Sequence, residues 1–269
     1  MLKDITFGQY FEGNSVIHKA DPRIKILFMI WLIVFIFVSG NAYSLLLSCI
    51  FVIAVLFISK VKFKMYLKNL KAILPVLIFT ALINVFYSQT GKVLLDFWKI
   101  TITTGGIYRS VFMSLRIILL IFVSSVLTYT TTPNDLTDGI ESLLSPLKYI
   151  GLKNAVHTLA MMMTIALRFI PTLIEEAEKI MNAQKARGAD LESGGLIQRV
   201  KALIPILIPL LISSVRRASE LAEAMECRCY NGGEGKTRMK QMRLSVVDAI
   251  VSMFCVSFGA LIIVFNILF

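Results

Sequence analysis

Five apolar runs in the chain have about the length of a membrane-spanning helix. They cover residues 24–39, 42–59, 72–87, 107–129 and 246–269. About 17–25 helical residues are needed to cross the hydrocarbon core of a bilayer. The pattern therefore predicts an all-α integral membrane protein with about five transmembrane helices.

Between the fourth and fifth runs, residues 132–243 follow a different pattern. From Glu175 to Asp190, and again up to Tyr230, apolar residues recur at helical spacing with charged residues on the other faces. Both stretches are expected to form long amphipathic helices. The apolar run before the first ends near Pro171, where a kink is expected. The run before the second holds Pro205 and Pro209, and is predicted to lie at an interface rather than span.

The two amphipathic stretches repeat one plan. Each has a proline-marked apolar segment, an amphipathic helix, an arginine at its end and a glycine-rich stop. The two arginines, Arg187 and Arg228, lie 41 positions apart. With the change of pattern it indicates three regions: an N-terminal cytoplasmic segment and four membrane helices in 1–131, a cytoplasmic domain of amphipathic helices in 132–243, and a final span in 244–269.

Charge supports this division and gives an orientation. Of the 17 acidic residues, 12 lie within residues 132–243, and the net charge of the whole chain is +11. Basic residues gather beside the spans at 19–25, 60–71 and 236–243. Basic flanks favour the cytoplasmic side, so we expect the N-terminus and residues 132–243 inside and the C-terminus outside. No basic stripe is interleaved with aromatic residues, so the charge does not indicate nucleic-acid binding.

The sequence offers no motif for catalysis, for a cofactor or for a metal. The sequence 235–237 resembles part of a phosphate loop, but Tyr230 stands where that motif needs glycine. Cys227 and Cys229 have no second pair of ligands nearby in sequence. We therefore predict a protein that is not an enzyme and has no ATPase motif of its own.

Three arginines lie where a charge needs an explanation. Arg116 is inside the fourth apolar run, where an ionised side chain is costly. It either pairs with another helix, reaches a wet cavity or extends to the outer surface. Arg187 and Arg228 at helix ends have a simple explanation in the helix dipole. The alternative is docking, because a guanidinium with five donors suits carboxylates or carbonyls of a partner.

Four segments in this order resemble the transmembrane (T) component of energy-coupling factor transporters. They are GQYFEGNSVIHKADPRIKI, LTYTTTPNDLTDGIESLLSPLK, IALRFIPTLIEEAEKIMNAQKARGAD and ALIPILIPLLISSVRRASELAEAMECRCY. The first contains what looks like the family's N-terminal signature, formed by Asp21, Pro22, Arg23 and Lys25. The similarity runs nearly from end to end.

The resemblance implies partners and a docking site. Members of this family of ABC-type importers pair with two cytosolic ATPase subunits and a membrane-embedded, substrate-binding S component. Crossed coupling helices seat an Ala-Arg-Gly motif in a groove of each ATPase. The first motif is intact here as Ala186, Arg187 and Gly188. The second reads Cys227, Arg228 and Cys229, so the arginine is kept and the terminal glycine is missing.

The resulting hypothesis is a non-catalytic scaffold and transducer in the plasma membrane of a prokaryote. It would couple ATP hydrolysis by its partners to the uptake of a vitamin or other micronutrient. The alternative is a self-sufficient secondary transporter or another polytopic permease. That class predicts paired polar residues at the midplane and inverted repeats of spans, whereas the repeat here lies in residues 132–243.

Overall fold

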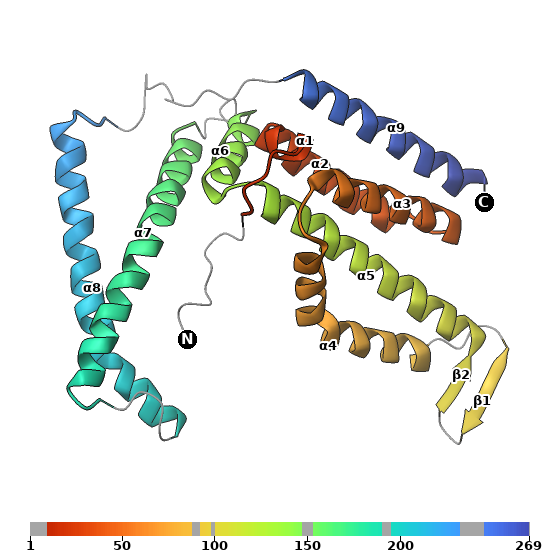
Figure 1. The fold of residues 1–269 in the computed structure, drawn as a ribbon, viewed down its shortest axis with the longest axis horizontal. Helices are drawn as coiled ribbons and strands as arrows, with labels where there is room; N and C mark the ends of the chain where they lie inside the picture. The colour runs from red at the N-terminus through yellow and green to blue at the C-terminus, as the bar shows by residue number, and fades with distance from the viewer. Residues whose placement is uncertain are drawn as a thin grey trace. The chain divides into compact units, whose positions relative to one another are not determined.

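The computed structural model describes residues 10–87, 92–97, 100–146, 153–189, 195–231 and 245–268. The chain divides into two compact units, one of Ile140–Gln241 and one of Gln9–Gly139 with Met242–Phe269. The boundary falls inside a helix, α6 (Pro133–Leu143). Figure 1 shows the elements of both units.

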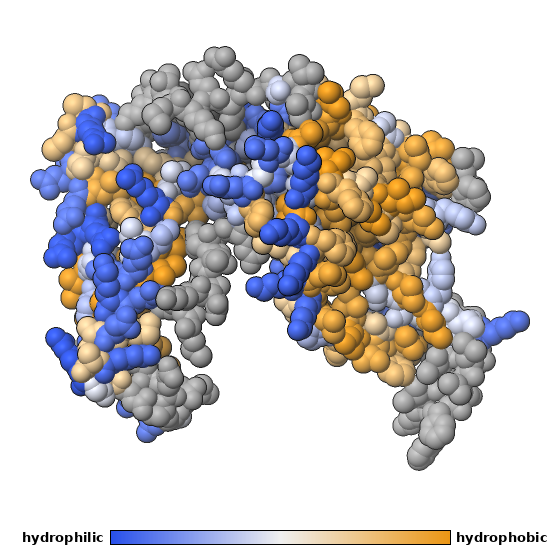
Figure 2. Space-filling model, in the orientation of Figure 1, coloured by the Kyte–Doolittle hydropathy of each residue, from blue (hydrophilic) through white to orange (hydrophobic). Residues whose placement is uncertain are grey.

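The larger unit, which we call the membrane unit, is a bundle of five long helices. They are α2 (Pro22–Val38), α3 (Ala42–Ser59), α4 (Phe63–Tyr87), α5 (Thr104–Thr130) and α9 (Val246–Leu268). A short helix, α1 (Val16–Lys19), precedes them. An antiparallel hairpin of β1 (Val93–Phe97) and β2 (Ile100–Thr103) connects α4 to α5. In Figure 2 the visible face of this unit is largely apolar, with hydrophilic side chains along the edge where α4 begins.

The first end of α2 is held by buried charges. The Asp21 side chain caps the helix by accepting from the Arg23 backbone N–H at 3.0 Å. The Asp21 N–H donates to Asp248 of α9 at 2.8 Å, and Asp248 is only 2% exposed. The Lys25 ammonium donates to the Thr130 carbonyl, the last residue of α5, at 3.0 Å. The side chains of Asp21, Asp248 and Lys25 thus pair with backbone groups at helix ends, which find no partner within their own helix.

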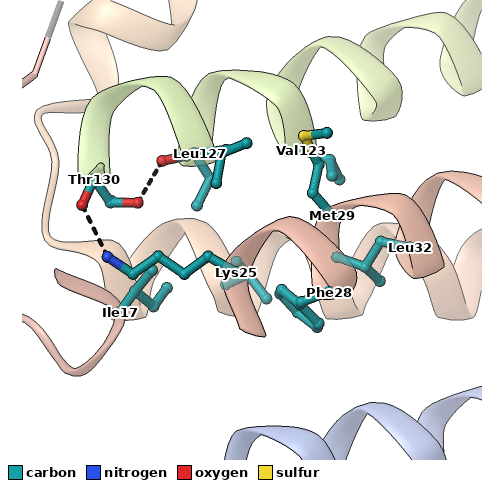
Figure 3. Close-up of a pocket in the computed structure, with 10 residues that line it drawn as sticks. Ile17, Lys25, Phe28, Met29, Leu32, Val123, Leu127 and Thr130 are labelled. Carbon is teal, nitrogen blue, oxygen red and sulfur yellow. Dashed lines mark hydrogen bonds between the residues drawn. The ribbon is translucent and has the colours of Figure 1, made fainter. Parts of the chain in front are cut away.

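Figure 3 shows the surroundings of the Lys25 side chain. Its stem lies among apolar residues of α2 and α5, beside a cavity of about 30 Å³. A single water needs roughly 10–15 Å³, so this cavity has room for a water or two and not for a nutrient. Lys25 also donates to the carbonyl of His18 at 3.1 Å, which ties α1 to the same cluster.

The second end of α2 is held by two other helices. Arg116 of α5 donates to the carbonyl of Ser39, the C-terminal cap of α2. Asn266 of α9 donates to the Val38 carbonyl at 2.8 Å and accepts from the Gly40 N–H at 3.3 Å. These contacts order the bundle. Because α9 meets the first end of α2 through Asp248 and the second through Asn266, the two helices run parallel, whereas α5 runs antiparallel to both.

Glycine allows α9 to approach α2 closely between those two contacts. A Cβ atom added at Gly259 would lie 2.2 Å from the Trp31 ring and 2.9 Å from the Phe35 ring. Small residues let membrane helices approach in this way, where packing rather than hydrophobic exclusion drives association. Any larger side chain at position 259 would push α9 away from α2.

Polar contacts also set the direction of α4. Asn69 near its start donates to Ser125 near the end of α5 at 3.1 Å, and Ser110 near the start of α5 donates to the carbonyl of Ala81 at 3.0 Å. The Tyr66 hydroxyl lies 3.0 Å from that of Ser59, at the end of α3. Consequently the starts of α2, α4 and α9 and the ends of α3 and α5 share one end of the bundle. We call this the basic end, because Lys60–Lys71 lies there.

The smaller unit contains two long helices, α7 (Lys153–Ala186) and α8 (Leu196–Cys227). They pack against each other, and Figure 1 shows that they cross. The end of α7 and the start of α8 lie at one end of the pair, and the end of α8 lies at the other. The expectation that Pro205 and Pro209 break the second apolar segment is wrong, because both lie within α8, and Pro171, where a kink was expected, lies within α7. A proline removes one backbone donor, and the remaining bonds of helices this long keep them continuous.

The helical architecture is confirmed, and its details differ from the prediction. Six described helices are long and apolar enough to cross a membrane, where about five spans were expected. Four of them are α3, α4, α5 and α9, and the other two are α7 and α8, which join apolar and amphipathic segments into one helix. The expected first span is α2, at 17 residues. The helix of the third span begins at Phe63 rather than near position 72, because Tyr66 turns inward and is buried against Ser59.

The buried lysine provides a test of this bundle. Replacing Lys25 with Met keeps the stem and leaves the carbonyls of Thr130 and His18 without their donor. We expect the free energy of unfolding in detergent to fall by about 2–3 kcal/mol, as for other lost hydrogen bonds to charged groups. The control is Lys19→Met, at an exposed lysine of α1. Equal unfolding temperatures for the two variants would contradict a stabilising role for the hydrogen bonds of Lys25 to Thr130 and His18.

Candidate functional site

The end of α7 is a well-formed helix cap that presents an arginine. The Gly188 N–H donates to the Lys185 carbonyl at 3.0 Å, and the Ala189 N–H donates to the Gln184 carbonyl at 3.0 Å. Gly188 has φ +85°, the left-handed conformation that follows many helices and favours glycine. This Schellman arrangement fixes the direction of the chain directly after Arg187.

The end of α8 has the same cap without glycine. The Cys229 N–H donates to the Glu226 carbonyl at 2.8 Å, and the Tyr230 N–H donates to the Met225 carbonyl at 3.0 Å. Cys229 takes the position of Gly188 with φ 55°. A side chain in this conformation costs roughly 1–2 kcal/mol. The missing glycine therefore makes the second cap more strained and leaves its hydrogen bonds unchanged.

Both arginines are available to a partner. All six residues of the two tips, Ala186–Gly188 and Cys227–Cys229, are exposed. Among the described residues, neither Arg187 nor Arg228 forms a side-chain hydrogen bond or an ion pair. An Ala or Cys before each arginine and a Gly or Cys after it leave the guanidinium as the largest group at each tip.

An ion pair holds α7 and α8 together where they cross. Glu176 accepts from both Ser213 and Arg217 of α8. Position 217 lies 41 residues after 176, the same offset that relates Arg228 to Arg187. The crossing thus joins equivalent positions of the duplication. Each arginine lies eleven residues beyond it, or about 16 Å along its helix at 1.5 Å per residue, so the two tips have arms of equal length.

The other residues singled out in the sequence lie in the membrane unit. Asp21, Pro22, Arg23 and Lys25 form the start of α2 and its contacts, and Arg116 meets the end of α2 and lies over the Phe112 ring at 5.0 Å. None of them belongs to the tips. Sequence reasoning did not find the partners Asp248, Asn266, Glu176 and Arg217, because each contact joins positions remote in the chain.

His18 completes the cluster at the start of α2. Its ring lies 2.6 Å from the Ser15 hydroxyl through Nδ1 and 2.9 Å from the Phe11 carbonyl through Nε2. Burial lowers the pKa of His18 below its usual value of 6.5; the hydrogen bond to the Phe11 carbonyl opposes this shift, and the nearby Lys25 charge adds to it. The imidazole is therefore neutral at pH 7, where it connects the segment before α1 to the bundle. Within the described residues no three His, Cys, Asp or Glu side chains are grouped as metal ligands.

Fold and site together define a helical, multi-pass membrane protein with a crossed helix pair that carries two exposed arginines. Comparison with known families places it more narrowly. Residues 13–239 match the model of the CbiQ family, described as cobalt transport protein. The chain belongs to this family, among the transmembrane components of energy-coupling factor transporters.

Relatives share most or all of their length with this chain. It is 49% identical to an energy-coupling factor transporter transmembrane protein EcfT of Ruminiclostridium cellulolyticum, across the whole of both chains. It is 51% identical to the EcfT of Clostridium kluyveri, over 94% of this chain and 93% of that one. The EcfT of Bacillus subtilis is 40% identical, with 97% and 98% covered.

The left-handed cysteine gives a test of the second cap. Cys229→Gly should raise the stability of the end of α8 by about 0.5–1 kcal/mol, because relief of the left-handed conformation exceeds the entropy lost by glycine. Gly188→Ala is the matched change at the first cap and should destabilise it by about 1 kcal/mol. Amide exchange at the two helix ends measures both effects. Faster exchange in Cys229→Gly would show that the cap does not form.

Proposed function

We propose that this chain is the non-catalytic scaffold and transducer of an energy-coupling factor importer. Two cytosolic ATPase subunits dock on the tips of α7 and α8, one on each arginine. ATP binding and hydrolysis move the two helices, and the motion passes to a membrane-embedded S component that carries a vitamin or another micronutrient. This chain provides the docking sites and transmits the motion, whereas its partners hydrolyse ATP and recognise the substrate.

The equal arms of the crossed pair are the observation that carries this proposal. Two equivalent ATPases need two equivalent contacts, and the ion pair of Glu176 with Arg217 is flanked by an identical helical distance to Arg187 and to Arg228. Both tips end in the same cap. A lone arginine at a helix end is explained by the dipole, whereas two with matched arms and caps fit a pair of sockets.

The apolar surface of α8 supports a membrane partner. Large hydrophobic side chains are exposed all along its first half, namely Ile197, Val200, Leu203, Ile204, Leu207, Ile208, Leu211 and Ile212. Exposed apolar patches of this extent mark contact with protein or lipid. The second half is amphipathic. We assign the apolar first half to contact with the S component and lipid, and the amphipathic second half to contact with the ATPase.

The bundle directions support an orientation. The basic end of the membrane unit holds the starts of α2, α4 and α9. The basic segments at 19–25 and 60–71 therefore lie on the same side of the bundle as the start of α9. Following the preference of basic flanks for the cytoplasm, we place this end inside. The start of the chain is then cytoplasmic, and the end of α9 faces outward.

The secondary-transporter alternative gains no support from the polar residues of the spans. Arg116 binds the end of α2, and Asn84 donates to the Thr80 carbonyl of its own helix at 2.8 Å. Both side chains satisfy backbone groups of the bundle. Paired polar groups around a substrate at the midplane, which that mechanism requires, are not formed by these two residues.

Charge reversal at the tips tests the docking role. Arg187→Glu and Arg228→Glu should each weaken recruitment of the ATPase subunits by about thirtyfold, the loss expected for an interfacial hot spot. The double variant should recruit neither subunit and support no uptake. Co-purification from membranes and uptake in cells measure the two effects.

The control for this series is Lys179→Glu, which makes the same change of charge at an exposed position of α7 away from the tip. It should recruit the ATPase subunits as the wild type does. If the double variant still recruits them at full yield and supports uptake, docking does not involve the two arginines.

Cysteine labelling tests the orientation. In a Cys227→Ser, Cys229→Ser background, Lys64→Cys lies at the exposed start of α4 and Tyr87→Cys at its exposed end. A membrane-impermeant maleimide should label Lys64→Cys in inverted vesicles only and Tyr87→Cys in intact cells only. The reverse pattern would overturn the assigned sides.

A further inference from the structure

An open apolar groove runs along the outside of the membrane unit at its basic end. It has a volume of about 460 Å³ and is lined by Ile53, Leu56, Phe57, Lys60, Val61, Phe63, Tyr66 and Phe122. This volume falls within the range of roughly 300–1,000 Å³ that is usual for ligand sites. Its walls come from the end of α3, the start of α4 and one residue of α5.

The groove has one charged end and one apolar end. Lys60 is its single ionisable cation, and the other lining side chains are apolar except for the Tyr66 hydroxyl, which is paired with Ser59 at 3.0 Å. Ile53 lies seven residues earlier in α3, so the groove extends about 10 Å from Lys60 toward the middle of the helix at 1.5 Å per residue. Phe57 and Phe63 stand at its sides, and Phe57 is 79% exposed.

The charge at Lys60 has no partner in the described part of the chain. Its ammonium forms no hydrogen bond or ion pair among the described residues, and the segment 60–71 contains no acid. The neighbouring Lys62 instead approaches the Phe11 ring, 6.0 Å from its centre. Lys60 also has φ 55° at the cap of α3, a conformation that glycine adopts without strain. A lysine here places a positive charge at the mouth of the groove.

We propose that this groove binds an anionic phospholipid. The phosphate pairs with Lys60 at the membrane edge, and an acyl chain lies along Ile53, Leu56 and Phe57 toward the bilayer core. Charge complementarity selects the occupant, because basic pockets between helices on the cytoplasmic side attract anionic headgroups. A wholly apolar partner helix would cover the apolar walls and leave the lysine unpaired.

This site consists of residues of the membrane unit alone, includes no residue of the two tips, and needs neither ATPase nor S component. It depends on the membrane embedding of the family and on the basic end lying at the membrane edge. A lipid held between α3 and α4 would fix the turn at Lys60–Lys62, and with it the start of α4. Failure of lipid binding would leave the docking proposal untouched, and failure of docking would leave the lipid site.

Native mass spectrometry of the full chain in detergent tests the proposal, with phosphatidylglycerol and phosphatidylcholine of identical acyl chains as probes. The wild type should bind phosphatidylglycerol more tightly. Lys60→Gln should lower that affinity by about fivefold, as expected for one lysine near a membrane surface. Ile53→Trp, which fills the groove, should lower the affinity for both lipids.

Matched controls lie next to each change. Lys68→Gln removes an exposed lysine of α4 outside the groove, and Ile50→Trp enlarges an exposed residue of α3 outside it. Both should bind lipid as the wild type does. Equal affinity for the two lipids, or an equal loss in Lys60→Gln and Lys68→Gln, would overturn the site. So would a photoreactive residue at position 57 that crosslinks in membranes to a polypeptide instead of to lipid.

Discussion

The membrane unit depends on how the two ends of α2 are satisfied. A helix leaves unpaired N–H groups at its start and carbonyls at its end, and a bilayer supplies no water to pair with them. Here Asp21 caps the first end and donates its own N–H to Asp248 of α9, while the second end accepts from Arg116 of α5 and Asn266 of α9. Lys25 of α2 in turn donates to the last carbonyl of α5. Because those partners belong to α2 itself, α5 and α9, the same contacts fix which helices are neighbours and which way each runs.

The charges inside the bundle therefore serve architecture, and those at the tips are free to serve recognition. Asp21, Lys25 and Arg116 are engaged with backbone groups of the unit. Arg187 and Arg228 are exposed and positioned by rigid caps. The crossing at Glu176 and Arg217 joins them through arms of equal length, which suits the proposed role of receiving two equivalent inputs and passing on one motion.

The structure agrees best with the sequence predictions where residues close together in the chain determine the secondary structure. Span positions agreed for α3, α5 and α9, since a long apolar run has few other stable forms in a membrane. Predictions failed at prolines and at the start of α4. Pro205 and Pro209 were expected to break their segment, yet α8 continues through both, as α7 does through Pro171, where only a kink was expected. Residues 60–71 were placed before the third span because of their lysines, yet they include the first turns of α4, where Tyr66 is buried.

By itself the sequence determined the positions of α3, α5 and α9, the duplication, the arginine at each tip and the excess of basic charge beside the helices. All of these depend on neighbours a few residues apart. Tertiary structure alone decided the partners of Lys25, Asp248 and Arg116, the crossing at equivalent positions, and the groove beside Lys60. The cap of α8 needed both. Cys229 in place of glycine suggested from sequence that α8 ends differently from α7, whereas the structure shows the same cap hydrogen bonds at both helix ends. The physical reason is that the free carbonyls at helix ends can accept from any well-placed donor. Only the folded chain shows which side chain lies close enough to donate.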